Sequence, residues 1–230
     1  MDENQILTKT YPVVNFYRVL LQTQHENYLT ILPGAQEGLT IQAPTQVLSR
    51  IKARVRNRTL EISLGGDWKE RLRDALSTSL SRSHISYVLR VNRLTSLEVF
   101  ALAHIRAERL KARQLSIRFN GAGTLALEDL TAERLAIMLS GANRAQCSGE
   151  VIEQSIILRG MSQYDASQLR SKRTNIELTG AGAITVWTLD RLEVDIRGPG
   201  SVGYYGAPDV YEKLSPLSSL THLEGAQALA

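Results

Sequence analysis

A short phrase recurs five times between Leu97 and Tyr205, and this repetition constrains the fold more than any other feature. Each copy has an aliphatic residue, a variable residue, an apolar residue, a second variable residue and then glycine. The five glycines follow one another at steps of 20, 19, 20 and 18 residues: Gly121, Gly141, Gly160, Gly180 and Gly198. A repeat of this length is typical of stacked units that cannot bury an apolar face alone. The sequence therefore predicts a solenoid.

The spacing within each copy favours β-strands. The two apolar positions before each glycine alternate with variable ones, so both side chains point to the same side of a strand. About 20 residues hold two or three short strands with their bends, which fits one coil of a parallel β-helix. The leucine-rich repeat shares this period, but its consensus is absent. We expect the glycines to form corners and two inward stacks to form the core: Ile117, Ile137, Ile156, Ile176 and Val194 beside Phe119, Leu139, Leu158, Leu178 and Ile196.

The N-terminal third is less regular but is also predicted to be rich in strands. Leu39 and Ile41, and later Leu60 and Ile62, alternate with polar residues. Residues 67–80 instead show helical spacing and predict one short amphipathic helix that covers an end of the solenoid. The expected organisation is an arm over 1–10, a β-helix domain over 11–212 and a flexible tail over 213–230. Within the domain, irregular rungs span 11–96 and regular repeats span 97–205.

Composition excludes few functions. The 230-residue chain has a net charge of +4 and 43% hydrophobic residues, which is ordinary for a soluble protein. Its single cysteine, Cys147, excludes an intrachain disulfide and is expected to be a small buried core residue. The first residues are acidic and polar, unlike a secretion signal, and no run has the roughly 20 apolar residues of a membrane span. On these features alone we expect a cytoplasmic protein.

The repeats and the N-terminal third together resemble the putative auto-transporter adhesin head GIN domain family. The resemblance covers residues 11–212 and is carried by three kinds of phrase: Phe16-Tyr-Arg-Val19; the extended stretches Leu39-Thr-Ile41 and Leu60-Glu-Ile62; and Gly-x-Gly at Gly121-Ala-Gly123, Gly180-Ala-Gly182 and Gly198-Pro-Gly200. It implies a single-stranded right-handed parallel β-helix of non-enzymatic character with a surface or adhesive role. No catalytic residues are carried over.

The chain departs from this family in three features. It begins without the secretion signal that many members carry. The cytoplasmic location expected from the sequence therefore conflicts with the cell-surface location that the resemblance implies. It has the helix-like insert at 67–80. Asn143 and Ser162 replace the second glycine of the phrase in two repeats.

No cofactor or metal site is expected. The four histidines are scattered and never paired at metal-binding spacing, and one cysteine does not make a zinc site. The phrase Gly121-Ala-Gly123 resembles part of a phosphate loop, but a strand rather than a helix follows it. Corner glycines are the favoured interpretation.

Two acidic residues near the last repeat raise the question of catalysis. Glu193, Asp195 and Arg197 occupy every second position of one strand and so point to the same side. Paired carboxylates on a β-helix are typical of some polysaccharide-cleaving enzymes. Two outward acids beside an arginine are also typical of an ordinary solvated strand. A carbohydrate-active enzyme therefore stays an alternative.

A basic run suggests a second alternative, a cytoplasmic polyanion-binding protein. Lys52, Arg54, Arg56 and Arg58 are expected to project from one strand face, as phosphate contacts require. The competing interpretation is a solvated face that keeps an exposed strand from pairing with other chains. No aromatic residues are interleaved to stack bases, so nucleic acid is not the favoured partner.

Aromatic residues near the last repeats form the remaining candidate surface. Trp187 and Tyr205, with Tyr204 and Tyr211 close by, could stack on sugars or dock a partner, or could cap the core, since the repeat places Tyr204 inward. The main hypothesis is a non-catalytic binding or structural module with an adhesin-like role. Its expected partners are a second copy of itself or a surface glycan or protein.

Overall fold

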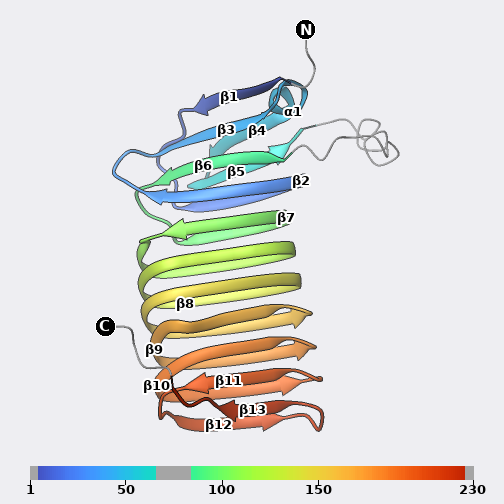
Figure 1. The fold of residues 1–230 in the computed structure, drawn as a ribbon. Helices are drawn as coiled ribbons and strands as arrows, with labels where there is room; N and C mark the ends of the chain where they lie inside the picture. Colours follow the sequence, from blue (N-terminus) through green and yellow to red (C-terminus); the bar gives the residue numbers. More distant parts are fainter. Residues whose placement is uncertain (1–4, 66–83, 226–230) are drawn as a thin grey trace.

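The computed structural model describes residues 5–65 and 84–225, and in it the chain winds into a β-solenoid of about 6 turns (Figure 1). Strands make up 78% of it, which confirms the predicted all-β solenoid. The elements in chain order are β1 (Ile6–Tyr11), β2 (Arg18–Pro33), β3 (Gly38–Pro44), α1 (Thr45–Arg50), β4 (Ile51–Arg56), β5 (Thr59–Leu64), β6 (Ile85–Val91), β7 (Ser96–Glu108), β8 (Lys111–Gly160), β9 (Gln163–Gly180), β10 (Ala183–Arg197), β11 (Ser201–Tyr205), β12 (Asp209–Leu214) and β13 (Ser219–His222).

The regular rungs are joined by parallel pairing in the register that the repeat predicts. Leu97 on β7 lies beside Ile117 on β8, and Ile176 on β9 lies between Ile156 and Val194. Each residue therefore stacks on the residue one repeat away. Many strands run through several bends, so β8 alone covers 50 residues.

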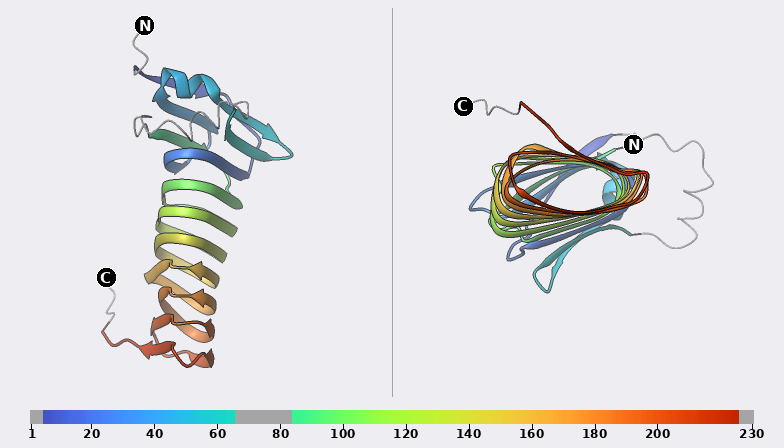
Figure 2. Two further views of the ribbon diagram at one scale, coloured as in Figure 1. Left: turned by 90° about the vertical axis from the view of Figure 1, so that its right-hand side faces the viewer. Right: turned by 90° about the horizontal axis from the view of Figure 1, so that it is seen from below.

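The core fills the inside of the coil. Both predicted stacks are buried throughout, and Phe119 and Leu139 have no exposed surface. A second inward pair in each rung, such as Ile184 and Val186, lines the opposite wall. Seen along the axis, the rungs superpose as a flattened ring around this core (Figure 2, right).

Two structural constraints meet at the repeat glycines, as Gly141 shows. Gly141 has a φ of 110°, a backbone conformation that other residues rarely adopt. A methyl group on its Cα would lie 2.2 Å from the carbonyl oxygen of Gly121 on the rung before, so the rungs can approach only without a side chain.

The N-terminal end does not continue the parallel stack. There β3 pairs antiparallel with both β1 and β6, while α1 crosses between β3 and β4. The sequence did not predict α1, because six residues carry too little periodicity to identify a helix; only Leu48 is buried in it. The helix that we expected at 67–80 lies outside the described residues.

A hairpin of β4 and β5 leaves the body near this end (Figure 2, left). Asn57 and Arg58 form its two-residue loop with φ values of 48° and 62°, as a tight hairpin of this twist requires. The prediction that Arg58 shares a strand face with Lys52 is therefore wrong, because Arg58 lies in the loop. Its carbonyl oxygen accepts hydrogen bonds from the backbone nitrogens of Tyr17 and Arg18, which fasten the loop to the start of β2.

Strand pairing continues beyond residue 212, where we had placed the end of the β-helix domain. β12 pairs with β10, and β13 pairs with β11, so residues as far as His222 add a further partial rung instead of a free tail. Tyr204 is partly buried against the core, and its ring stacks on His222 at 5.0 Å between centroids. These contacts cover the C-terminal end of the core.

Candidate functional site

A trough with a volume of about 620 Å3 runs along the outside of the regular rungs. Short segments about one repeat apart contribute to it in turn, because parallel stacking brings them into line. We call it the lateral trough. Its lining residues are Thr95, Gln114, Leu115, Ser116, Arg134, Leu135, Ala136, Glu153, Gln154, Ser155, Arg173, Thr174, Asn175, Arg191 and Glu193.

The strand alternation explains the trough's two walls. In each rung an outward residue, an inward residue and a second outward residue follow one another. Glu153, Arg173 and Arg191 stand in register on one wall, while Ser155, Asn175 and Glu193 stand in register on the other. One wall therefore carries long charged side chains, and the other carries mostly small polar ones.

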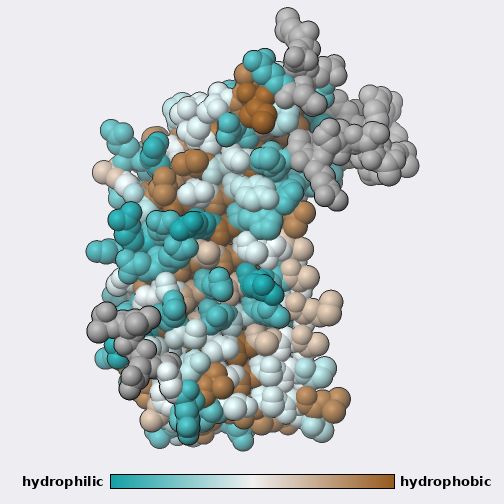
Figure 3. Space-filling view, viewed as in Figure 1, coloured by the Kyte–Doolittle hydropathy of each residue, from teal (hydrophilic) through white to brown (hydrophobic). Residues whose placement is uncertain are grey.

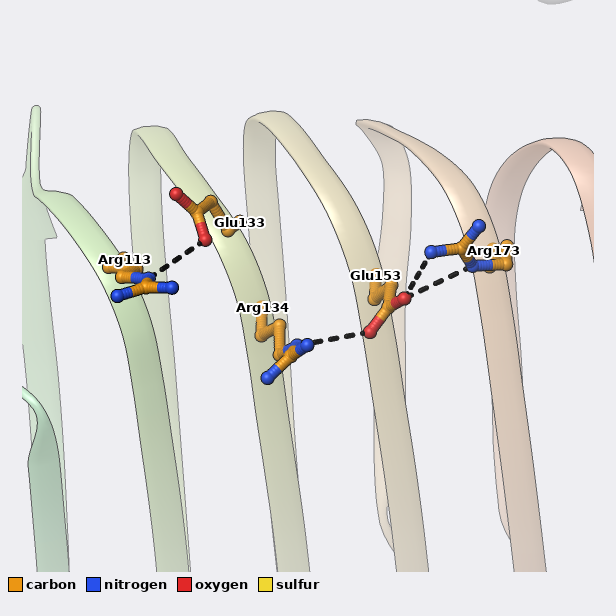
Figure 4. A network of polar contacts seen from close by, with 5 residues as sticks. All are labelled: Arg113, Glu133, Arg134, Glu153 and Arg173. Carbon is orange, nitrogen blue, oxygen red and sulfur yellow. Dashed lines mark hydrogen bonds and ion pairs between the residues drawn. The ribbon is translucent and has the colours of Figure 1, made fainter.

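Ion pairs link the charged wall from rung to rung (Figure 4). Arg134 Nε lies 3.3 Å from Glu153 Oε2, and Arg173 donates from both Nε and Nη2 to the other oxygen of Glu153. The hydrogen bonds from Arg173, together with the charges of Arg173 and Arg134, lower the pKa of Glu153. A neighbouring pair, Arg113 and Glu133, continues the pattern at 3.2 Å. These pairs are exposed, so they orient the side chains more than they stabilise the fold.

The floor of the trough contains a polar cluster that the sequence analysis missed. Gln154 is buried at an inward position and accepts a hydrogen bond from the hydroxyl of Tyr164 at 3.2 Å. Its amide nitrogen donates to Ser171 at 3.0 Å and to Thr174 at 3.2 Å. The hydroxyls of Thr174 and Thr188 are 2.6 Å apart. Every member has a partner, so the cluster fixes this part of the floor.

A signal for this cluster was present in the repeat. Aligning the copies places Gln154 and Thr174 at the position that Leu115 and Leu135 occupy in earlier rungs. Polar residues at an inward position of a repeat mark either a solvated bend or a buried network. The sequence does not distinguish these two cases.

The two acidic residues considered for catalysis have different surroundings. Glu193 lines the trough and pairs with Arg191 at 2.7 Å. Asp195 lies outside the lining and accepts a hydrogen bond from Arg197 at 2.7 Å, which lowers its pKa. Each carboxylate is thus paired with an arginine two residues away along the same strand.

The candidate aromatic residues divide between two columns. Trp187 and Tyr205 lie on adjacent rungs in register, both half-buried, with the guanidinium of Arg170 over the Trp187 ring at 5.1 Å. Tyr211 is exposed and belongs to another column, beside Glu193, where Arg191 lies 4.3 Å from its ring centroid. Tyr211 thus extends the wall of the lateral trough toward the C-terminus.

The basic residues of 52–58 lie in different surroundings. Lys52 and Arg54 line a second cavity beside the hairpin, whereas Arg56 is exposed and lies outside that lining. Arg54 pairs with Glu61 on the neighbouring strand at 3.0 Å. The structure therefore does not bring the four predicted cations together.

Other chemical groups are placed as follows. Cys147 is buried at its expected inward position, and burial raises the pKa of its thiol to about 12. Within residues 5–65 and 84–225, no three histidine, cysteine, aspartate or glutamate side chains gather in a group that could hold a metal ion. In the same part of the chain, no helix is long and apolar enough to cross a membrane. On the face in Figure 3, hydrophilic and apolar side chains are interspersed.

Comparison with solved structures finds the same solenoid in bacterial proteins. A putative adhesin from Bacteroides fragilis has a TM-score of 0.77 at 20% identity, covering 95% of this chain and 93% of that one. A putative adhesin from Parabacteroides distasonis has a TM-score of 0.69 at 14% identity, with 96% and 98% covered. A protein from the same species described as a putative lipid binding protein has a TM-score of 0.65 at 14% identity, with 96% and 95% covered. At these identities the likeness establishes the fold.

The sequence itself identifies the family. No curated protein matches the chain. The model of the family described as putative auto-transporter adhesin, head GIN domain, matches residues 16–208 and so spans the irregular rungs and the regular ones. The chain therefore belongs to the putative auto-transporter adhesin, head GIN domain family.

Proposed function

We propose that this chain is a non-catalytic, adhesin-like binding module and that its lateral trough holds a glycan chain. The observation that carries the proposal is the trough itself, a continuous channel across the regular rungs whose lining mixes polar and apolar groups. Neighbouring strands are about 4.8 Å apart, so the channel presents polar groups at a regular interval along the solenoid axis. An extended polymer of similar units suits such a channel better than a compact ligand does.

The chemistry of the walls supports a polyhydroxylated ligand. Guanidinium groups and the Asn175 amide donate hydrogen bonds, the carboxylates of Glu153 and Glu193 accept them, and Ser155 does both. Three arginines against two glutamates leave the lining close to electrical balance, which favours a neutral or weakly acidic sugar chain. The exposed ring of Tyr211 offers an apolar face at the C-terminal end of the wall that carries Ser155, Asn175 and Glu193.

The pairing of the acidic residues supports binding without cleavage. A glycosidase needs one carboxylic acid that holds a proton near neutral pH. The pKa of Asp195 is lowered by Arg197, so this carboxyl stays ionised. Asp195 also lies outside the trough lining, so it does not share a channel with Glu193.

The test combines a glycan array with variants that block the trough. Ser155→Trp places a large ring between the two walls, while Thr179→Trp places the same ring at an exposed position outside the trough lining. We expect Ser155→Trp to lower affinity for an array hit at least about tenfold and Thr179→Trp to leave it unchanged. Equal binding by both variants would contradict the trough as the site. Release of reducing ends from the bound glycan by the parent protein would contradict a non-catalytic role.

A further inference from the structure

A second cavity, with a volume of about 530 Å3, lies where the β4–β5 hairpin meets the body of the solenoid, and we call it the hairpin pocket. The strand register explains which side chains reach it. Lys52 on β4 is opposite Ser63 on β5, Ser63 is opposite Gln22 on β2, and Gln22 is opposite Phe100 on β7. These four side chains therefore form one outward row, which runs from the hairpin onto the first regular rung.

The charge of this pocket differs from that of the lateral trough. Lys52 and Arg54 line it together with Arg50, whose Nε donates to the carbonyl oxygen of Gly65 at 3.3 Å. Among the described residues that line the pocket, none is a carboxylate. Glu61 pairs with Arg54 from outside this lining. Cations gathered in a cavity with low-dielectric walls focus a positive potential on its interior.

The remaining lining selects among anions. Gln22 and Ser63 supply neutral hydrogen-bonding groups next to the cations, and Phe100 supplies an apolar ring that is 41% exposed. Lys and Arg side chains, hydroxyls and amides together suit the oxygens of a sulfate or phosphate group. An exposed aromatic face beside them suits the apolar face of a sugar ring. The volume falls in the range of about 300–1,000 Å3 that is usual for small-molecule sites.

We propose that the hairpin pocket binds a sugar that carries a sulfate or phosphate ester, with the ester at Lys52 and Arg54 and the ring against Phe100. This site is separate from the lateral trough and does not depend on the function proposed for it. The proposal limits anion binding by strand β4 to Lys52 and Arg54, because Arg56, on the same strand, lies outside the pocket. The pocket recognises one esterified group rather than a long polyanion.

The test is calorimetric titration of the full chain at low ionic strength with glucose 6-sulfate, glucose 6-phosphate, inorganic sulfate and glucose. Lys52→Gln and Arg56→Gln each remove one positive charge from β4, the first inside the pocket and the second outside it. Loss of a charge-assisted hydrogen bond should weaken binding of the esterified sugars about tenfold in Lys52→Gln. Arg56→Gln should bind within about twofold of the parent, because an exposed charge outside the site is screened.

Phe100→Ala tests the contribution of the aromatic ring to binding separately from that of the ester group. We expect this variant to lose affinity for glucose 6-sulfate while retaining that for inorganic sulfate. Thermal unfolding confirms that each variant is folded, and Ser155→Trp should leave binding unchanged because it blocks only the trough. The comparison of sulfate with phosphate ester identifies which of the two groups the pocket prefers. Equal losses in Lys52→Gln and Arg56→Gln, loss of binding in Ser155→Trp, or no binding of either esterified sugar would overturn the proposal.

Discussion

The regular rungs and the N-terminal end of this protein solve the same problem, the burial of an apolar strand face, in different ways. In the regular rungs each residue stacks on its repeat partner, so small differences between copies become columns along the axis. At the N-terminal end, antiparallel pairing of β1, β3 and β6 and the projecting β4–β5 hairpin interrupt those columns. The two regions therefore offer different surfaces.

This difference gives the solenoid two kinds of surface. The columns of the regular rungs pair opposite charges from one rung to the next, as Arg134, Glu153 and Arg173 do, and produce a long trough near electrical balance. The interruption at the N-terminal end produces a compact pocket in which cations gather. The glycan chain that we propose for the trough matches its length, and the esterified sugar that we propose for the hairpin pocket matches its compact shape.

The largest expected effect comes from the corner glycines. Gly141→Val adds a side chain at positive φ and against the Gly121 carbonyl, so we expect a loss of about 4 kcal/mol or more in the free energy of unfolding. Gly38→Val at the start of β3 is the matched change in the irregular region, where a Cβ meets nothing within 4 Å. That change should alter stability by about 1 kcal/mol or less. Urea denaturation measures both, and similar losses would remove the contrast between the regions.

Two phenylalanines on adjacent rungs test how the core is bounded. Phe119 is completely buried, so Phe119→Ala should cost about 3–5 kcal/mol of unfolding free energy through the cavity it leaves. Phe100 faces outward one rung earlier, and Phe100→Ala should cost about 0.5 kcal/mol or less. Denaturant unfolding followed by circular dichroism distinguishes the two. A large loss in Phe100→Ala would mean that the first regular rung is packed differently.

The buried polar cluster should matter less than the apolar stacks. Gln154→Leu keeps the volume but leaves the hydroxyls of Tyr164, Ser171 and Thr174 with fewer partners, so we expect a loss of about 1–3 kcal/mol. Gln146→Leu is the control, since Gln146 is exposed on the same strand. Thermal unfolding of the pair checks the expectation. Stabilisation by Gln154→Leu would show that the cluster is maintained for a reason other than stability.

The exposed ion pairs should have the smallest effect on folding. The pKa of Glu153 is lowered in the folded protein, so any stability it contributes is present above its ordinary pKa and disappears as the pH falls through the lowered value. Because the group is exposed, Glu153→Gln should hardly change the melting temperature at neutral pH. Carboxyl titration by NMR should show the Glu153 pKa rising toward normal in Arg173→Gln. An unchanged pKa in that variant would exclude Arg173 as the main cause.

Much of the regular region was predictable from sequence because one spacing determines its register. The inward stacks from Ile117 to Ile196 are buried as the repeat predicts, and the repeat glycines have positive φ. The lateral trough was not predicted, because its residues are individually ordinary and lie about 20 positions apart. Parallel stacking of the rungs brings them together.

The irregular region was less predictable because local turns decide it. The loop at Asn57 and Arg58 took Arg58 off the strand, although the alternating charges of 52–58 suggested a single face. The alternation at Leu39 and Ile41 predicts the strand β3, but it does not reveal that β3 pairs antiparallel with β1 and β6. For the same reason, the hairpin pocket follows from the register among β4, β5, β2 and β7 and from no motif.

The central claim is that glycan recognition belongs to the columns of the regular rungs, and hydroxyl-radical footprinting of the protein with a bound array glycan tests it most directly. Exposed side chains of the trough, including Arg173 and, at its edge, Tyr211, should become protected, while Phe100 in the hairpin pocket and the exposed Met161 should react as they do in the free protein. Protection at Phe100 or Met161 with none along the trough would contradict the claim.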